Sequence, residues 1–229
     1  MSLFAIGDLH LSLTASKPMD VFGGRWQGYT EKIIKGFNAV VKPEDTVVLC
    51  GDLSWGMDFN EAKEDFLYID RLPGKKIVLK GNHDYWWSTA TKAKAFFADN
   101  DIKSIEILNN NFFQYEDIAI CGTRGWFFEE EKGDEHDRKI MLRECGRLET
   151  SLKAAGNLDK YVFLHYPPKY LGYECPEILE IIRNYRVKQC IYGHIHSKGC
   201  SAAFTGNVDE TSFKLVSADY LDFIPAKIL

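Results

Sequence analysis

Nine polar residues that could bind a metal ion lie at or just after the ends of short apolar runs. These residues are Asp8, His10, Asp52, Asn82, His83, Asp84, His165, His194 and His196. Imidazole, carboxylate and amide groups without a thiolate are suitable ligands for divalent ions such as Mn, Fe or Zn. Each of these residues taken alone is more often a hydrogen-bonded side chain at a strand end than a metal ligand. All nine together would make a poor core, since buried polar groups need partners, and the joint pattern therefore favours a metal site.

The apolar runs before these residues are predicted to be strands. Strand-like runs occur at residues 3–7, 46–50, 76–80, 104–108, 117–122, 161–165, 189–193 and 212–216, and helical periodicity occurs at 29–41, 60–71 and 137–155. Strands that alternate with helices favour an α/β fold, while the strand-rich middle and C-terminal end indicate a second, more antiparallel sheet. In open α/β sheets ligands bind beyond the carboxyl ends of the strands, so we expect the polar residues to lie there.

Glycines and closely spaced ligand pairs are expected to determine the backbone conformation at these strand ends. Glycine can let the backbone turn sharply off a strand. The glycines at the strand ends are Gly7, Gly51, Gly81 and Gly193. Asp8 and His10, like His194 and His196, are two positions apart, and an extended backbone would point both side chains of a pair the same way. Each pair could then chelate metal.

The composition is that of an ordinary soluble globular protein, with 229 residues, 45% hydrophobic and 27% charged. A formal net charge of −5 provides no basic field for a nucleic-acid polymer. No apolar run approaches the roughly 18 residues that span a bilayer, and the N-terminus lacks the pattern of a signal peptide. The six cysteines form no CxxC pair and are expected to be reduced thiols, which predicts a cytoplasmic protein.

The series of motifs resembles the calcineurin-like metallophosphoesterase family. The family pattern D-x-H, G-D, G-N-H-D, a lone H and G-H-x-H is matched in order from Asp8 to His196. The resemblance covers nearly the whole chain and implies a single domain over residues 1–229. The implied fold is a four-layer αββα sandwich, in which two mixed β-sheets are flanked by helices. The implied cofactors are two divalent metal ions.

The resemblance also implies a role for each polar residue. Asp8, His10 and His196 would hold the first ion, Asn82, His165 and His194 the second, and Asp52 would bridge them. Two ions about 3.5–4 Å apart would activate a bridging hydroxide for in-line attack on phosphorus. His83 would face the substrate phosphate, and Asp84 would orient the His83 ring. Two dications, two aspartates and a hydroxide leave a net charge of roughly +1, which attracts phosphate.

Departures from the family patterns bear on the substrate. Protein phosphatases of this superfamily carry an arginine before G-N-H and a glutamate after it, where this chain has Lys80 and Asp84. The related double-strand-break nucleases are longer than this chain, which disfavours a nuclease. A lipid-linked substrate is disfavoured as well, because no basic amphipathic segment would favour docking on a membrane. A phosphodiesterase acting on a small or nucleotide-like substrate is the favoured prediction. The alternatives are a phosphomonoesterase, including a protein serine/threonine phosphatase, and a non-catalytic interaction scaffold.

Three further residues are candidates for substrate contact. Trp55 and Trp86 could form aromatic walls that stack on a flat group, or they could simply pack the loops. Arg124 could bind a phosphate through its guanidinium group, although an ion-pairing arginine is an equal alternative. The acidic stretch 127–139, with His136, is expected to be a long irregular segment, either a solvated loop or a lid over the site.

Overall fold

The computed structural model describes residues 1–127 and 135–229, and the chain forms two compact units. Unit 1 consists of Met1–Ile107 and Val216–Leu229, and unit 2 consists of Leu108–Leu215. Each unit contains one large mixed sheet and its own helices. The structure therefore confirms the mixed α/β class with two sheets flanked by helices. The single domain and the four-layer order of the sandwich remain predictions.

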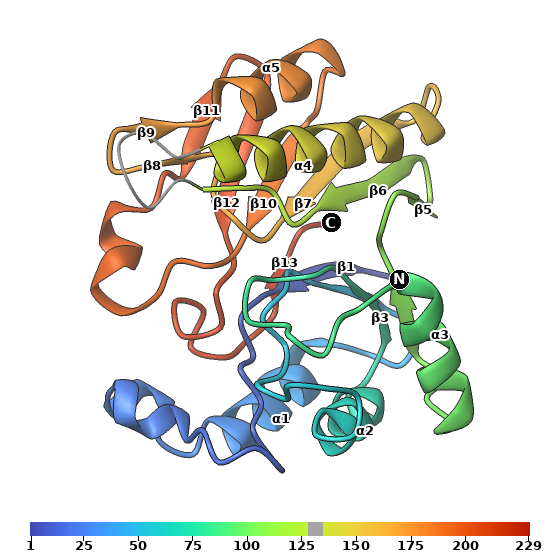
Figure 1. The fold of residues 1–229 in the computed structure, drawn as a ribbon, viewed down its shortest axis with the longest axis vertical. Helices are drawn as coiled ribbons and strands as arrows, with labels where there is room; N and C mark the ends of the chain where they lie inside the picture. The colour runs from blue at the N-terminus through green and yellow to red at the C-terminus, as the bar shows by residue number, and fades with distance from the viewer. Residues whose placement is uncertain (128–134) are drawn as a thin grey trace. The chain divides into compact units, whose positions relative to one another are not determined.

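Unit 1 is built on a five-stranded sheet with the strand order β13-β1-β2-β3-β4. Its strands are β1 (Leu3–Ile6), β2 (Thr46–Leu49), β3 (Lys75–Val78), β4 (Ile105–Ile107) and β13 (Ala226–Lys227). Strands β1 to β4 are parallel, and β13 pairs antiparallel with β1 at the edge. The connections contain α1 (Tyr29–Val40), α2 (Lys63–Arg71), α3 (Ala90–Asp99) and the short 3-10 helices η1 (Met19–Phe22) and η2 (Gly24–Trp26) (Figure 1).

The helices of unit 1 pack on one face of this sheet through their apolar sides. Helix α1 buries Ile33 and Phe37, which are four residues apart and so share a face. The same core includes Phe66 and Ile69 of α2, Ala93 and Phe97 of α3, and the alternate strand residues Phe4, Ile6, Val47, Leu49 and Val78. Alternate residues of a strand point to one face, so this core fixes which face the helices cover. The polar residues Asp8, Asp52 and Asn82 lie outside this core, in the loops that follow the carboxyl ends of the strands.

Unit 2 is built on a six-stranded sheet with the strand order β11-β12-β10-β7-β6-β5. Its strands are β5 (Phe113–Tyr115), β6 (Ile118–Thr123), β7 (Asp159–Leu164), β10 (Gln189–Tyr192), β11 (Gly206–Val208) and β12 (Thr211–Leu215). The four inner strands are parallel, and β5 and β11 pair antiparallel at the two edges. The greater antiparallel content that we expected here is confined to those edges. Strands β8 (Lys169–Tyr170) and β9 (Tyr173–Glu174) form a separate ribbon, and a 3-10 helix, η3 (Ser197–Ala202), follows β10.

Two helices, α4 (Glu135–Ala154) and α5 (Pro176–Asn184), cover one face of the sheet of unit 2 (Figure 1). Their buried side chains include Met141, Cys145, Leu148 and Leu152 of α4 and Ile178, Ile181 and Ile182 of α5. They pack on alternate residues of β6, β7, β10 and β12. Each unit therefore supplies one helical layer and one sheet layer.

The sequence missed some helices and misplaced one boundary. Helices α3 and α5 were not predicted, although Thr89 caps α3 by accepting a hydrogen bond from the Lys92 backbone N–H at 3.2 Å. Helix α4 begins at Glu135, inside the stretch 127–139 that was expected to be irregular and two residues before the predicted helical periodicity, and Glu135 pairs with Lys139 at 2.8 Å. Acidic residues favour a helix N-terminus, which explains this start. His136 is exposed on α4, and residues 128–134 of the expected loop lie outside the described residues. None of the described helices is long and apolar enough to cross a membrane.

Candidate metal centre

The three strands of unit 1 that precede predicted ligands end at one level of the sheet. The last residues of β1, β2 and β3 are paired across the sheet, Ile6 with Leu49 and Leu49 with Val78. The pairing continues into the loops, because the Asp8 backbone N–H donates to the Gly51 carbonyl oxygen at 2.8 Å. The parallel sheet therefore delivers the three polar loops to the same edge.

Three of the predicted ligands meet within unit 1. A carboxylate oxygen of Asp8 lies within 4.8 Å of a ring nitrogen of His10 and of a carboxylate oxygen of Asp52. The His10 Nε2 atom lies 3.7 Å from the Asp52 Oδ2 atom. Asp8, His10 and Asp52 are 0%, 3% and 1% exposed. Two buried carboxylates so close together repel each other, and a divalent cation between them would relieve that repulsion.

The backbone of these ligands is left-handed and not extended as we expected. The φ angles are 61° at Asp8, 46° at His10 and 52° at Asp52, and His194 in unit 2 has a φ of 72°. Non-glycine residues are uncommon in this region, and such residues cluster at functional sites where surrounding contacts hold them. The spacing rule for extended backbone therefore does not apply to Asp8 and His10, because both have positive φ angles.

The glycines at these strand ends act in two different ways. Gly51 has a φ of 83°, which an ordinary side chain rarely adopts. Gly81 is needed for space, because a Cβ atom there would lie 2.1 Å from the Asp52 Oδ1 atom. Of the four strand-end glycines, only Gly51 therefore has the positive φ for which a sharp turn needs glycine. The missing side chain at Gly81 lets the carboxylate of Asp52 approach the loop that carries Asn82.

Asp52 contacts both neighbouring loops through its two oxygen atoms. Its Oδ1 atom accepts a hydrogen bond from the backbone N–H of His83 at 2.8 Å, while its Oδ2 atom faces His10. The residues Asn82 and His83 are half-buried, so both remain accessible from solvent. Asp52 thus lies between the loop of the first predicted ligand group and the loop that carries Asn82.

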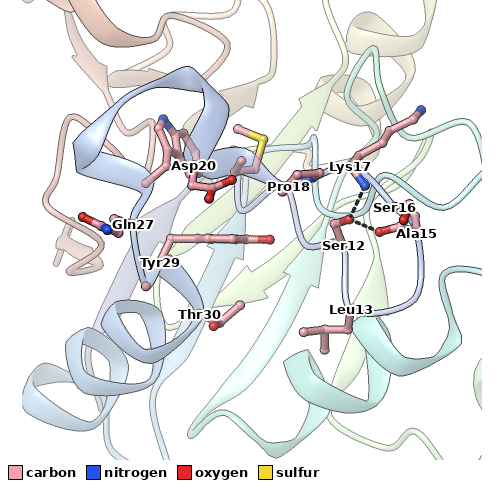
Figure 2. A pocket seen from close by; sticks show the side chains of 13 residues that line it. Ser12, Leu13, Ala15, Ser16, Lys17, Pro18, Asp20, Gln27, Tyr29 and Thr30 are labelled. Carbon is pink, nitrogen blue, oxygen red and sulfur yellow. Dashed lines mark hydrogen bonds between the residues drawn. The ribbon is translucent and has the colours of Figure 1, made fainter.

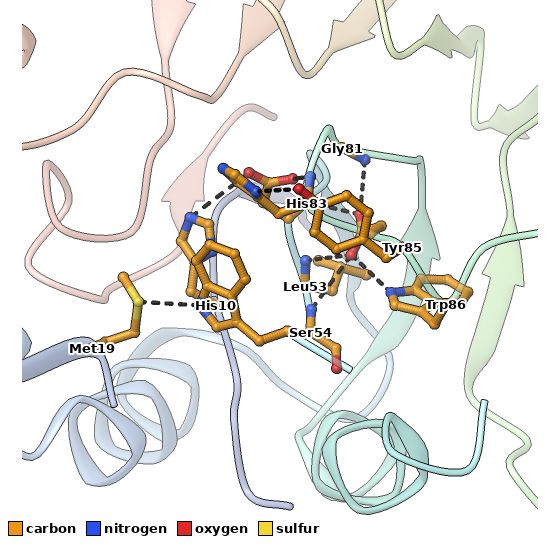
Figure 3. Close-up of polar contacts among 11 residues, drawn as sticks. His10, Met19, Leu53, Ser54, Gly81, His83, Tyr85 and Trp86 are labelled. Atoms are coloured by element: carbon orange, nitrogen blue, oxygen red, sulfur yellow. Dashed lines mark hydrogen bonds and ion pairs between the residues drawn. The ribbon is translucent and has the colours of Figure 1, made fainter. Parts of the chain in front are cut away.

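Asp84 has partners different from the one we expected. Its buried carboxylate accepts hydrogen bonds of 2.7–2.9 Å from the backbone N–H groups of Asp52, Leu53 and Gly81 and from the indole N–H of Trp86 (Figure 3). These contacts hold the backbone of the turns and do not involve the His83 ring. Around that ring, the Tyr85 hydroxyl lies 3.4 Å from Nδ1. Asp84 is therefore a positioning residue for the two ligand loops.

The two tryptophans that were predicted as possible substrate contacts lie in different environments. Trp86 is only 2% exposed and packs in the core of unit 1, so the prediction that it contacts a substrate was wrong. Trp55 is half-buried and stacks on the His10 ring with 5.0 Å between ring centroids, and its centroid lies 4.5 Å from that of His83. The Lys17 ammonium group lies 4.9 Å from the same indole. Trp55 therefore borders the candidate centre and stays a candidate.

A pocket of about 470 Å³ lies beside the loop that follows His10 (Figure 2). Loop residues 12–20 and the start of α1 line it, with Lys17 and Asp20 as the charged groups. The Tyr29 side chain belongs to the lining, and its hydroxyl donates a hydrogen bond to the His10 carbonyl oxygen at 3.1 Å. The pocket and the candidate centre therefore share this loop.

The ligands that the sequence predicts in unit 2 follow β7 and β10. The two strands end side by side, with Leu164 paired to Tyr192. His165 directly follows Leu164, and His194 lies two residues after Tyr192. The two imidazole centroids are 5.1 Å apart, and the Tyr166 ring lies 4.5 Å from that of His194. His165 is fully buried, whereas His194 and His196 are half-buried. Unit 2 thus brings two imidazoles together, with His196 two residues further along.

Arg124 forms the ion pair that we considered as its alternative role. Its guanidinium group lies 3.5 Å from the carboxylate of Glu144, which also accepts hydrogen bonds from Arg147 at 2.6 Å and from the Thr123 hydroxyl. The Arg124 carbonyl oxygen accepts a hydrogen bond from the backbone N–H of His165 at 3.1 Å. Arg124 therefore supports the position of His165, and a phosphate contact remains only a prediction.

Sequence reasoning missed two buried acidic residues on helices. Asp65 of α2 and Glu144 of α4 are both 0% exposed, and each contacts a loop at the carboxyl end of a strand. A signal was present in the sequence, since each acidic residue falls within or beside the apolar stripe of its helix. A charge at such a position has to find a buried partner.

Comparisons with known proteins agree with this description. The chain matches the family model "Calcineurin-like phosphoesterase" over residues 1–198. No curated protein matches the chain. Among solved structures, a protein of unknown function, AQ665 from Aquifex aeolicus, has a TM-score of 0.55 at 19% identity, covering 99% of this chain and 95% of that one. TT1561 of Thermus thermophilus has a TM-score of 0.55 at 14% identity, covering 86% and 82%. Such identities support the fold alone, but the family match spans most of the sequence, and the chain belongs to the calcineurin-like phosphoesterase family.

Proposed function

We propose that this protein is a metal-dependent phosphodiesterase that acts on a small phosphate ester. The observation that carries the proposal is the buried group of Asp8, His10 and Asp52 at the carboxyl edge of the unit 1 sheet, with the half-buried His83 beside it. Carboxylate and imidazole without thiolate suit Mn, Fe or Zn. Family membership supports metal-dependent phosphoester hydrolysis as the reaction.

The proposed ligands are Asp8, His10, Asp52, Asn82, His165, His194 and His196. The order of the family motifs along the sequence supports this assignment. When bound, two divalent ions would polarise the phosphate ester and lower the pKa of water for in-line attack.

The residues around the ligands have separate roles in this proposal. We assign His83 to the substrate phosphate or its leaving oxygen, because its ring is half-buried and its backbone is fixed by Asp52. Asp84 positions the loops of Asp52 and Gly81 through backbone hydrogen bonds. A positioned imidazole that protonates a leaving oxygen typically contributes about 10²–10⁴ in rate.

The surroundings of His83 support a small diester as the substrate. Trp55 and the 50% exposed Tyr85 flank the His83 ring, so an ester group beyond the phosphorus atom would meet aromatic surface. Lys17, whose ammonium group lies 4.9 and 5.8 Å from these two rings, adds a positive charge. The pocket beside the His10 loop offers further space for an organic group.

The proposal is tested by removing and restoring metal. Protein treated with a chelator should not hydrolyse bis(4-nitrophenyl) phosphate, and Mn²⁺ should restore the reaction. The same preparation is assayed with 4-nitrophenyl phosphate, and the diester should be the better substrate. A better monoester would indicate a phosphomonoesterase instead. Failure to hydrolyse either ester with Mn, Fe or Zn would favour the interaction scaffold.

A further inference from the structure

Asp65 lies on α2, away from the family motifs, yet it contacts two of the loops that carry proposed ligands. Its Oδ1 atom accepts a hydrogen bond from the Leu13 backbone N–H at 2.9 Å, three residues after His10. Its Oδ2 atom accepts one from the Ser54 hydroxyl at 2.5 Å, two residues after Asp52. One buried carboxylate therefore joins the loop after β1 to the loop after β2.

The two loops run side by side up to the position of Asp65. The Leu11 N–H donates to the Leu53 carbonyl oxygen at 2.9 Å, and the Trp55 N–H donates to the Leu11 carbonyl oxygen at 2.9 Å. These bonds extend the β1–β2 pairing beyond the strands, and Leu11 and Ser54 form an isolated parallel bridge. Asp65 closes the far end of this extension. The Ser54 hydroxyl oxygen also accepts a hydrogen bond from the Gly56 N–H at 3.0 Å, so the serine itself is held in place.

This arrangement bears on the spacing of the ligands themselves. Asp8, His10 and Asp52 all have left-handed backbones, which other contacts must hold in place. Asp84 supplies such contacts between the β2 and β3 loops. The Asp65 carboxylate supplies them between the β1 and β2 loops, from a helix that belongs to the core of unit 1.

We propose that Asp65 is a positioning residue that sets the distance between His10 and Asp52 and so controls metal affinity. This inference rests on the proposed metal site. Residues that orient metal ligands from outside the site typically change affinity or activity by about 10–100-fold when mutated. Removal of the Asp65 carboxylate should therefore weaken Mn²⁺ binding by about that factor, although Asp65 is not itself a ligand.

The test measures Mn²⁺ binding by the metal-free full-length protein, using the EPR signal of free Mn²⁺. Asp65→Leu should bind about 10–100-fold more weakly than the wild type. Asp65→Asn should stay close to the wild type, because its amide oxygen can accept from Leu13 and its amide N–H can donate to Ser54.

Asp45 provides a matched control within unit 1. It is 4% exposed and accepts hydrogen bonds from the backbone N–H groups of Ser2 and Lys42 at 2.6 and 2.9 Å, but it precedes β2, at the opposite end of the strand from the ligands. Asp45→Leu should lose stability without a change in Mn²⁺ affinity. Equal losses of affinity in the two leucine variants would show a general effect of stability and overturn the proposal.

A second variant keeps the test decisive if Asp65→Leu does not fold. Ser54→Ala removes the hydroxyl contact with Asp65, together with the hydrogen bond from the Gly56 N–H, and should weaken Mn²⁺ binding several-fold. Unchanged affinity in folded Asp65→Leu, or in Ser54→Ala where the former does not fold, contradicts the role of Asp65. Failure of the wild type to bind Mn²⁺ would instead contradict the proposed metal site.

Discussion

The two units hold their predicted ligands by different means. In unit 1, the buried carboxylates of Asp84 and Asp65 accept hydrogen bonds from the loops that carry Asp8, His10, Asp52 and Asn82. In unit 2, His165 and His194 lie against each other and against the Tyr166 ring, and the backbone of His165 donates to the Arg124 carbonyl oxygen. In unit 1 the carboxylates that are not ligands thus accept directly from backbone N–H groups of the ligand loops. In unit 2, within the described part of the chain, the buried carboxylate of Glu144 contacts only side chains, those of Thr123, Arg124 and Arg147, and backbone pairing and ring packing hold the imidazoles.

This difference follows the charge of the ligands. The ligands predicted in unit 1 include two aspartates, and those predicted in unit 2 are imidazoles only. Two carboxylates within 4.8 Å of each other repel, so their loops need strong contacts to stay together when no cation is bound. Neutral imidazoles do not repel in this way. We therefore expect changes in unit 1 to have the larger effects on metal binding.

The largest effect is expected for Asp52→Asn. Asp52 contacts the His83 backbone and faces His10, and the amide would remove the negative charge proposed to be shared by both ions. Bound metal should fall from two ions per chain, and turnover should be largely lost. Elemental analysis and hydrolysis of a nitrophenyl diester measure both. Two tightly held ions with normal turnover in this variant would contradict the bridging role.

His83→Ala should have the next largest effect, and the effect should depend on the leaving group. If His83 protonates the departing oxygen, an alkyl ester should slow by about 10²–10⁴ and a nitrophenyl ester far less, since nitrophenolate needs little protonation. Metal content should not change. An equal loss on both esters would mean that His83 binds the phosphoryl group without acting as an acid.

The ends of the strands were the part of the fold best predicted from the sequence. Apolar runs locate β1, β2 and β3 closely, and register across parallel strands then places Asp8, Asp52 and the Asn82 loop at one edge. What the sequence could not show was the backbone conformation there. The left-handed φ of Asp8 and His10 depends on hydrogen bonds with Gly51 and Asp52, which are distant in sequence.

The partners of buried polar groups were equally hard to predict. Asp84 lies next to His83 in sequence, which suggested a contact between their side chains, but its carboxylate accepts from the backbone of Asp52 and Leu53 instead. Trp86 is accordingly turned into the core, where its indole donates to Asp84. Adjacent residues on a tight turn point in different directions, and only the three-dimensional structure shows which way.

A smaller effect, on the free energy of unfolding, should differ between the two units. Asp84→Leu leaves four backbone N–H groups and one indole N–H without this acceptor, and each buried unsatisfied donor costs about 1–3 kcal/mol. We expect a loss of more than about 3 kcal/mol in the free energy of unfolding. Glu144→Leu in unit 2 should cost only about 1–2 kcal/mol, because the Arg124 and Arg147 side chains are 19% and 38% exposed and can be hydrated. Denaturant unfolding compares the two variants, and equal losses would remove the distinction between the units.

The smallest expected effect is a difference in pH dependence. Lys76 of unit 1 is fully buried, and its ammonium group donates to the carbonyl oxygens of Asp70, Leu72 and Gly74 at 3.2, 2.6 and 2.8 Å. Burial lowers the pKa of Lys76 to about 8, whereas its ordinary value is 10.5. In unit 2, burial raises the pKa of the Cys121 thiol from 9.0 to about 11. The two shifts have opposite consequences for stability.

Between pH 8 and 9, the unfolded chain keeps the Lys76 proton that the folded protein loses, so the free energy of unfolding should rise with pH. Above pH 9, the folded protein keeps the Cys121 proton that the unfolded chain loses, so the contribution of this thiol should fall. Lys76→Met removes the first contribution only. From pH 7.5 to 9, the wild type should gain about 1 kcal/mol relative to this variant in denaturant unfolding. If the two proteins instead keep a constant difference over that range, Lys76 does not titrate there, and its ammonium group stays charged in the core of unit 1.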